Sequence, residues 1–389
     1  MAMQWLKRMF GLAGAEVSDP SLSSSSVGFA TEVEGGEISL DSMEKPTQAG
    51  IKHLHTPRAL AAEFVSVLDR AFCERLYGPE LIFVSPSKEQ KAQAQRLVKQ
   101  ISGMELSSEQ LPRRPSSIPM LTKLLKIEDL NFQQISDAML SDPALTSQVL
   151  KTANSPFFKL NNIDVLSLDQ AAFRLGVGGI KKVVSAAVMM PAFKIANQDP
   201  EVSSVVWEWA LATAKAFDLI VHARGPLEGS VYLPGLLPAL SLLIVFQQID
   251  KLEKDTPEHL RLLPVQRFQV FKQVAWKLCC SIRNEWGLPS FYDRYLLVLK
   301  PTEIGDTTWV GFDPTFNAEN DGQSKSRRDA KATGTEKINK LLGDALHCAQ
   351  YALVEASIGS PINIDQLSEI TGTSEKENRL MLVELAGRP

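Results

Sequence analysis

The residues of this chain that could bind a metal or attack a substrate are few, and their spacing favours neither role. A helical metal site needs ligands three or four residues apart, or an acidic side chain beside a histidine. Neither His222 nor His259 has a partner three or four residues further on or an adjacent Asp, so we interpret both as surface or helix-end residues. His53 and His55 have the spacing of two ligands on a strand, but they border a polar leader and are interpreted as incidental. The fifth histidine is His347. The residue types therefore predict no catalytic, cofactor-binding or metal-binding site.

The spacing of the cysteines disfavours metal-binding and redox functions. The four of them, Cys73, Cys279, Cys280 and Cys348, include no Cys-x-x-Cys pair, which disfavours a zinc site and a thioredoxin-like motif. Cys279 and Cys280 are neighbours in an apolar helical pattern. Buried thiols in a reducing compartment fit this usage better than a redox switch, so we expect a cytoplasmic protein.

Composition is ordinary for a globular protein of one large or two smaller domains. The chain has 389 residues, of which 44% are hydrophobic and 22% charged, and a net charge of −4. This net charge gives no support for broad electrostatic binding of nucleic acid, but it does not exclude a local basic patch on the surface. The longest apolar run, 231–246, contains two prolines and a glycine, so we predict a buried helix and no transmembrane segment.

The N-terminal residues offer one more apolar pattern. Trp5, Leu6, Met9 and Phe10 would share one face of a short helix that could touch a membrane surface or a partner. A frayed terminus is the alternative that we favour. Residues 1–50 are otherwise rich in Ser, Gly, Glu and Thr and predict a disordered leader.

Helical periodicity dominates the rest of the chain, and strand-like alternation is scarce, which predicts an all-α, multi-helix bundle. A helical N-terminal segment covers 51–110, the main domain 111–301, a linker or long loop 302–337, and a helical C-terminal segment 338–389. Within these segments, the expected helices run over 56–76, 88–101, 120–126, 132–140, 143–153, 205–221, 235–246 and 268–285.

The stretch 141–158 contains a helix with clear start and stop signals and no obvious nucleophile or metal ligand. Asp142 is a good N-cap, Pro143 suits the first helical position, and the run 154–156, Asn-Ser-Pro, ends the helix. Its apolar residues Leu145, Val149, Leu150 and Ala153 fall on one face. We interpret it as an element for packing and recognition.

A family resemblance emerges when this stretch is read together with its neighbours. The motifs Ile118-Pro119, Asp142-Pro-Ala-Leu-Thr146, Ala153-Asn-Ser155, Gln170-Ala171, Leu175-Gly176 and Trp286-Gly-Leu-Pro289 appear in order with fitting spacing. Together they resemble an HDOD domain, a helical output domain of bacterial signalling proteins related to the HD-type metal phosphohydrolases. The resemblance covers 111–301 and implies an HDOD/HD-like bundle with helical extensions at both ends.

The same resemblance indicates which positions would bind the metals in a working HD hydrolase. A working HD hydrolase holds its metals with a histidine on one helix, a His-Asp pair on the next, and a further Asp. The pair typically follows Gly-Leu-Leu, and the matching run here is Gly235-Leu-Leu-Pro238-Ala239, while Trp209 is the best match to the earlier histidine. The resemblance therefore implies a non-catalytic regulatory module that binds a protein partner, or a small molecule or nucleotide. A cryptic metal-dependent phosphohydrolase is the alternative.

Two further patterns have competing interpretations. Gly176-Val-Gly-Gly179 could suggest a phosphate-binding loop, but it follows a helix and lacks a P-loop lysine, so we favour a helix–helix turn. Lys181 and Lys182, which follow it, could face an anionic partner, although such pairs are more often solvated. In the tail 364–385, two helical stretches around Gly372 imitate a helix-turn-helix. The second stretch has no basic excess, so we favour a protein-docking or packing unit over DNA binding and a transcriptional role.

Overall fold

The fold was analysed in a computed structural model that describes residues 57–80, 82–104, 111, 114–126, 134–135, 139, 143–155, 157–158, 164–196, 199–224, 231–301, 329–358, 364–371, 376, 378–379, 382 and 385. The regular structure of these residues is helical throughout, which confirms the predicted all-α class. Its α-helices are α3 (Pro57–Tyr77), α4 (Lys88–Gly103), α5 (Ile118–Lys126), α7 (Pro143–Ala153), α8 (Leu168–Ala196), α9 (Pro200–Arg224), α10 (Tyr232–Leu252), α11 (Pro264–Glu285), α12 (Asp293–Leu296), α13 (Asp329–Ile358) and α14 (Ile364–Thr371).

Several sequence predictions lie outside these residues and are not addressed by the structure. They are the leader 1–50, the pair His53 and His55, the N-cap Asp142, and most of the helix expected over 132–140.

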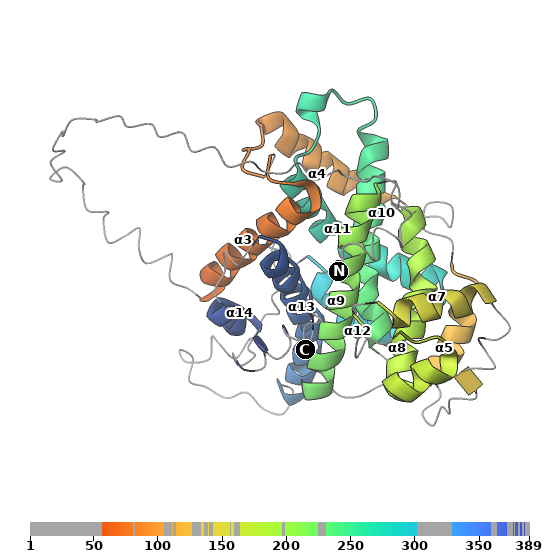
Figure 1. The fold of residues 1–389 in the computed structure, drawn as a ribbon. Coiled ribbons are helices and arrows are strands. Elements are labelled where there is room, and N and C mark those ends of the chain that lie inside the picture. The colour runs from red at the N-terminus through yellow and green to blue at the C-terminus, as the bar shows by residue number, and fades with distance from the viewer. Residues whose placement is uncertain are drawn as a thin grey trace, which may run out of the picture.

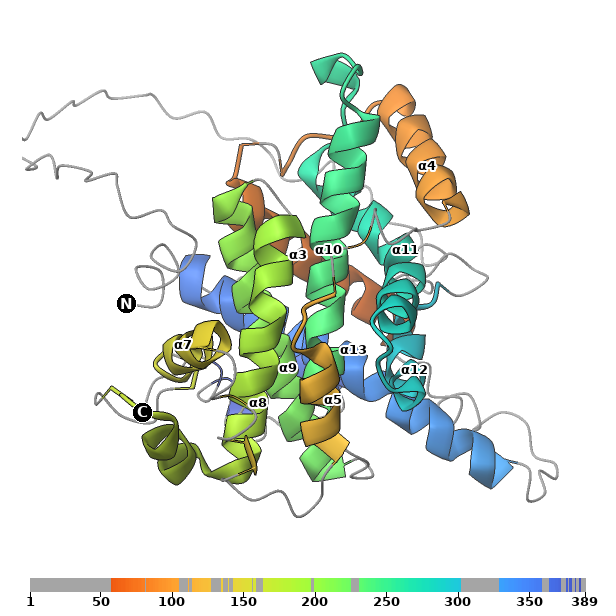
Figure 2. The same ribbon diagram turned by 90° about the vertical axis from the view of Figure 1, so that its right-hand side faces the viewer.

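The centre of the fold is α10, which is buried along nearly its whole length. It lies between α8 and α9 on one side and α11 on the other (Figure 2). Gly235 permits the contact with α9, because a Cβ at this position would lie 2.7 Å from the Cα of Ala214. Two further positions in this helix are prolines, Pro234 and Pro238, and both are buried.

Two of the described helices, Leu168–Phe193 and Tyr232–Leu252, are long and apolar enough to cross a membrane by length and composition alone. The most apolar window of Tyr232–Leu252 is 94% buried among the other helices, as expected for a core helix. The other stretch is divided at Gly176, whose φ of +67° interrupts α8. This division is the helix–helix turn that the sequence favoured over a phosphate-binding loop.

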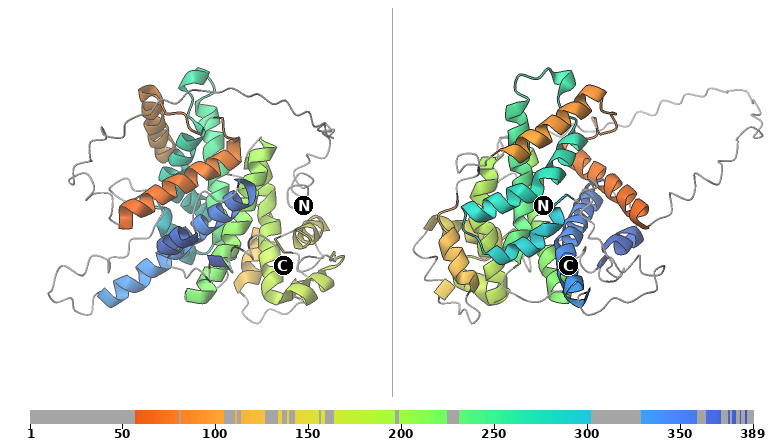
Figure 3. Two further views of the ribbon diagram at one scale, coloured as in Figure 1. Left: turned by 60° about the vertical axis from the view of Figure 1, so that its left-hand side comes forward. Right: turned by 180° about the vertical axis from the view of Figure 1, so that it is seen from behind.

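Helices α3 and α13, which flank the central helices in the sequence, pack on the same side of the bundle. In Figures 1 and 3, α3 and α13 lie side by side, and both contact α9. Helix α3 also contacts α11. Because α13 begins at Asp329, it includes residues that the sequence assigned to the linker 302–337. The helical extensions are therefore packed on the central helices.

Local signals explain several helix boundaries. The hydroxyl of Ser87 accepts from the N–H of Gln90 at 3.1 Å, and the Gln90 side chain accepts from the Ser87 N–H at 2.9 Å. This capping box starts α4 where the sequence placed its first residue. The bounds of α7 are also those predicted, 143–153.

Candidate functional site

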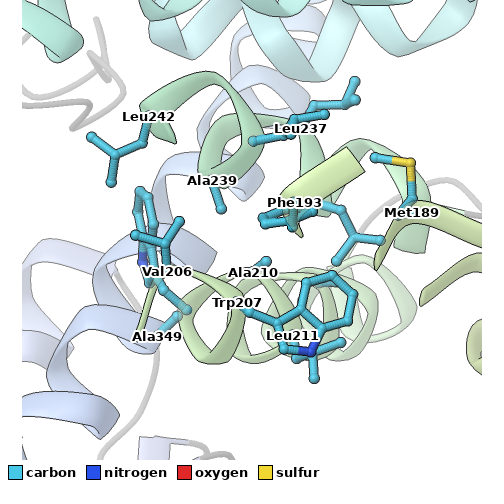
Figure 4. Packing of buried hydrophobic residues seen from close by; sticks show 14 of the residues in the cluster. Met189, Phe193, Val206, Trp207, Ala210, Leu211, Leu237, Ala239, Leu242 and Ala349 are labelled. Atoms are coloured by element: carbon cyan, nitrogen blue, oxygen red, sulfur yellow. The ribbon is translucent and has the colours of Figure 1, made fainter. Parts of the chain in front are cut away.

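The position that the HD resemblance assigns to the metal-binding pair lies in the first half of α10. Pro238 and Ala239 are both buried, and Ala239 is only 1% exposed. Figure 4 shows Ala239 directed from α10 toward α9, where Val206 and Ala210 lie opposite. The methyl group of Ala239 therefore fills a space between two tightly packed helices.

Apolar side chains from four helices surround this point. Phe193 of α8 and Trp207 of α9 make an edge-on contact there, with ring centroids 4.8 Å apart. The cluster is completed by Met189 of α8, Leu211 of α9, Leu237 and Leu242 of α10, and Ala349 of α13, all of them buried (Figure 4). Such packing excludes water and provides no oxygen, nitrogen or sulfur ligand other than a methionine thioether.

Trp209, which the resemblance matches best to the earlier histidine, belongs to a second aromatic cluster. Its indole is fully buried, and its ring centroid lies 5.0 Å from that of Phe72 in α3. The rings of Phe268 and Phe271 in α11 are each 6.3 Å away. Trp209 thus joins α9 to the N-terminal extension helix and to α11.

The side chains at these positions do not fit a divalent metal. Proline, alanine and tryptophan carry no atom that could replace an imidazole or a carboxylate as ligand. Among the described residues, no group of three or more His, Cys, Asp or Glu is placed to hold a metal ion.

Asn154, in the motif that follows α7, acts as a structural clamp. Its side-chain amide donates to the carbonyl of Val165 at 2.8 Å and accepts from the N–H of Val165 at 2.7 Å. Within α7, the hydroxyl of Thr146 donates to the carbonyl of Met139 at 2.9 Å. The motif residues therefore hold the segments on either side of α7 in place, which agrees with their interpretation as packing elements.

The comparison with known families decides what this arrangement is. Residues 111–296 match the family model of the HDOD domain. This part of the chain is an HDOD domain. The match begins at the residue where the sequence motifs placed the domain, and it confirms the resemblance that those motifs indicated.

The search of solved structures also found similar chains. One is an HDOD domain protein with unknown function from Geobacter sulfurreducens, with 17% sequence identity and a TM-score of 0.43, over 76% of this chain and 98% of that one. Another, named "Putative phosphohydrolase", comes from Shewanella amazonensis, with 16% identity and a TM-score of 0.44, over 75% of this chain and 94% of that one. Among the curated proteins, none matches.

The HDOD domain is tied to both extensions by a buried polar contact that sequence reasoning missed. Nζ of Lys272 in α11 lies 2.7 Å from Oδ2 of Asp69 in α3. The side-chain amide of Gln350 in α13 donates to the other oxygen of Asp69 at 3.4 Å. Burial raises the pKa of Asp69, and the charge of Lys272 opposes this shift. Burial also raises the pKa of the neighbouring Cys73 thiol well above its ordinary value.

Glu208, a buried carboxylate of the HDOD domain, lies where α3 packs on α9. Glu208 in α9 lies 3.6 Å from the guanidinium of Arg75 in α3. Burial raises the pKa of Glu208 to about 7, although Arg75 lowers it in part. This carboxyl group therefore changes its charge near neutral pH.

A third polar group lies where α8, α9 and α10 meet. Lys182 donates to Asp218 at 2.5 Å, and Nδ1 of His222 lies 2.7 Å from the backbone oxygen of Asp218. We expected Lys182 to be solvated. The contact of His222 was not predicted because Asp218 lies four residues before it, whereas only the residues after His222 were considered as partners. Burial, followed by the charge of Asp218, raises the pKa of Tyr232.

The other histidines occupy contrasting environments. His259 is exposed in a short 3-10 helix, Glu258–Leu260, in agreement with its predicted surface position. His347 is fully buried in α13, a setting that its sequence context did not reveal.

The tail after the HDOD domain packs against the extension helices. Leu367 of α14 is fully buried, and α14 contacts both α13 and α3. The side-chain amide of Asn378, 1% exposed, donates to the hydroxyl of Ser368 at 2.9 Å. In a helix-turn-helix, this amide would be one of the groups available to read a base edge. Here it is engaged by α14 itself.

Proposed function

We propose that this chain is a cytoplasmic, non-catalytic regulatory protein of bacterial signal transduction, which acts by binding a protein partner or a ligand through its HDOD domain. One observation carries the proposal, namely that Ala239, at the expected metal-binding position, is buried inside an apolar cluster. An HD-type reaction needs a metal to activate water and to polarise the phosphate ester.

Introducing a metal at this point would require more than two exchanged side chains. Carboxylate and imidazole ligands need space, second-shell hydrogen bonds and access for water. The cluster between α8, α9 and α10 contains large side chains, among them Phe193 and Trp207, where these would have to lie. The packing thus favours a scaffold whose surface, and not its interior, carries the function.

The test of catalysis uses the purified full-length protein, prepared without chelator. Its metal content is measured by mass spectrometry, and hydrolysis is assayed with bis-p-nitrophenyl phosphate and with a cyclic dinucleotide, with added manganese. We expect substoichiometric metal and no turnover above a heat-denatured control. Stoichiometric iron, manganese or zinc together with chelator-sensitive turnover would overturn the proposal in favour of a phosphohydrolase.

The binding function and its alternative through the tail can be tested separately. A salt-sensitive interaction with duplex DNA that is lost on removing residues 365–389 would support a transcription regulator. We expect no duplex binding at low salt. Capture of one protein partner by the full-length chain, and loss of that partner after substitutions on the HDOD surface, is the expected positive result.

A further inference from the structure

The solvent-facing side of α4 is strongly basic. This helix lies at the outside of the bundle, where it packs on α11 and α10 (Figure 2). Its inner side contains the buried residues Gln90, Leu97 and Ile101. All the cations of the helix are exposed instead, and they are Lys88, Lys91, Arg96 and Lys99. Steps of three, five and three residues keep these four side chains within less than half of the helix circumference, and we call them the α4 basic face.

The α4 basic face has no counter-charge of its own. The helix contains one carboxylate, Glu89, and hydrogen bonds from its own backbone and from Ser87 at the helix start hold the pKa of Glu89 below its ordinary value. Within the part of the chain that the structure describes, none of the four cations has an ion-pair partner. The four positive charges are therefore available to an anion from outside.

This distribution of charge does not help the helix to form. Opposite charges three or four residues apart stabilise a surface helix, whereas Lys88 and Lys91, like Arg96 and Lys99, are like charges at a spacing of three. The first turn is also the positive end of the helix dipole, where cations are disfavoured. Local stability therefore does not account for the basic face, and a bound anion would.

The basic face is held on a fixed support. The side-chain amide of Gln90 donates to the carbonyl of Arg261 at 2.8 Å, and Nζ of Lys277 donates to the carbonyl of Met104 at 2.6 Å. These contacts tie both ends of α4 to the HDOD domain. The short 3-10 helix that contacts α4 adds one exposed carboxylate, Glu258, and Arg261 beside it adds an exposed cation. The surroundings thus leave the face positive.

The extent and composition of the face limit the kind of anion that fits. Lys88 and Lys99 are about 16 Å apart along the helix axis. A protein that binds duplex DNA commonly makes about 6–10 phosphate contacts, more than four cations supply. Helices that lie on membranes also insert large apolar side chains, whereas the remaining exposed residues here include Ala92 and Gln95. The net charge of −4 would repel an extended polyanion elsewhere on the molecule, so a short acidic segment fits best.

We propose that the α4 basic face binds an acidic segment of a partner protein, about three helical turns long, whose Asp and Glu side chains pair with the four cations. This face lies outside the matched residues 111–296, so it is a binding surface of the N-terminal extension. Exposed charge pairs are screened by salt, and the contact is therefore reversible and sensitive to ionic strength. The proposal does not depend on whether the HDOD domain has catalytic activity.

Fluorescence anisotropy with the full-length protein tests this surface. The probe is a labelled, alanine-rich peptide of about 15 residues in which Glu recurs at every third or fourth position along one helical face. A matched peptide contains Gln in place of each Glu. We expect the Glu peptide to bind at about 50 mM salt and more weakly at about 150 mM, and the Gln peptide not to bind.

Two matched double variants show where the peptide binds. Lys91→Gln/Lys99→Gln removes two cations of the basic face, whereas Lys151→Gln/Lys300→Gln removes two exposed cations elsewhere, so both variants have the same net charge. The affinity for the Glu peptide should fall about five- to tenfold in the first variant and stay within about twofold in the second. Circular dichroism verifies that both variants remain folded, as their exposed positions predict.

Several results would overturn the proposal. They are the absence of binding of the Glu peptide at low salt, equal affinities for the Glu and Gln peptides, and equal losses in the two double variants. The same assay with vesicles that contain phosphatidylserine and with duplex DNA distinguishes the other anions. Tighter binding of either than of the Glu peptide, lost in Lys91→Gln/Lys99→Gln, would assign the face to a lipid surface or to nucleic acid instead.

Discussion

Lys272 of the HDOD domain, which is buried, and Asp69 of the N-terminal extension, which is largely buried, form an ion pair, although 203 residues separate them in the sequence. Gln350 of the C-terminal extension donates to the same carboxylate. One carboxylate thus connects three parts of the chain that the sequence presents as separate segments. A charge pair in such a setting contributes little net stability, but each partner depends strongly on the other.

Replacing Lys272 by Met should therefore destabilise the protein by about 3 kcal/mol, because it leaves Asp69 buried without its cation. The double variant Asp69→Leu/Lys272→Met should recover most of this loss. The free energy of unfolding, measured by urea denaturation, checks both values, and Lys91→Met on the exposed face of α4 is the control, with a change within about 0.5 kcal/mol. Strictly additive effects of the two substitutions would contradict the coupling.

Glu208 should make stability dependent on pH between its ordinary pKa of 4.5 and its raised pKa of about 7. The folded protein binds this proton more tightly than the unfolded chain, so its stabilising contribution is complete below about pH 4.5 and is lost as the pH rises through 7. Glu208→Gln, which carries no charge, should remove up to about 3 kcal/mol of this dependence.

Urea denaturation at pH 5 and pH 8 measures this difference for the unsubstituted protein and for Glu208→Gln. Glu285→Gln, at an exposed position of α11, serves as the control and should leave the dependence intact. If Glu208→Gln retained the full dependence, the raised pKa would have to belong to another group.

Ala239→Asp restores one half of the HD pair and should strongly destabilise the protein. A carboxylate at this position would enter an apolar cluster with no partner, at a cost of at least about 3 kcal/mol. The same substitution at Ala144, exposed in the first turn of α7, should change stability by less than about 0.5 kcal/mol. Thermal denaturation of both variants distinguishes burial from helix propensity. A stable Ala239→Asp variant would mean that water reaches this position.

The crossing of α9 and α10 should be sensitive to a single methyl group. Gly235→Ala would place its Cβ 2.7 Å from the Cα of Ala214, which cannot move without shifting the backbone of α9. We expect a loss of about 1–3 kcal/mol. Gly103→Ala, at the end of α4 where no atom lies within 4 Å of the new methyl group, should be neutral or stabilising by up to ~1 kcal/mol. Equal effects at the two glycines would disprove the close contact.

The clamp formed by Asn154 should be needed for the loop that it holds. Asn154→Ala leaves the N–H and C=O of Val165 without their side-chain partner, which should cost about 2 kcal/mol. Hydrogen exchange of residues 164–166 should become faster than in the unsubstituted protein. Asn284→Ala, exposed at the end of α11, is the control, and unchanged exchange in Asn154→Ala would show that the clamp is dispensable.

The sequence was a good guide wherever local patterns decide the structure. The bounds of α7 follow from Pro143 and the run 154–156, and the start of α4 follows from the pairing of Ser87 and Gln90. The turn at Gly176 could be predicted because Gly readily adopts a positive φ. These signals act within a few residues of the helix ends.

The polar contacts between helices could not be predicted in the same way. Lys272 and Asp69 look like ordinary surface charges in their own helices, and only the packing of α3 against α11 brings them together. For the contact of Lys182 with Asp218, the sequence contains one weak signal of a buried polar group. Asp218 continues the buried stripe of Trp207, Leu211 and Ala214. A carboxylate on a core face indicates a buried partner, but not which one.

The aromatic contact of Trp209 has a consequence for how this domain could be used elsewhere. Phe72, which covers it, belongs to α3 and lies outside the matched residues 111–296. A gene fusion that joined another protein at these two boundaries would leave a tryptophan and its aromatic neighbours open to water and prone to self-association. The unit that can be inherited or transplanted intact is therefore larger than the family signature, and it includes α3 and α13.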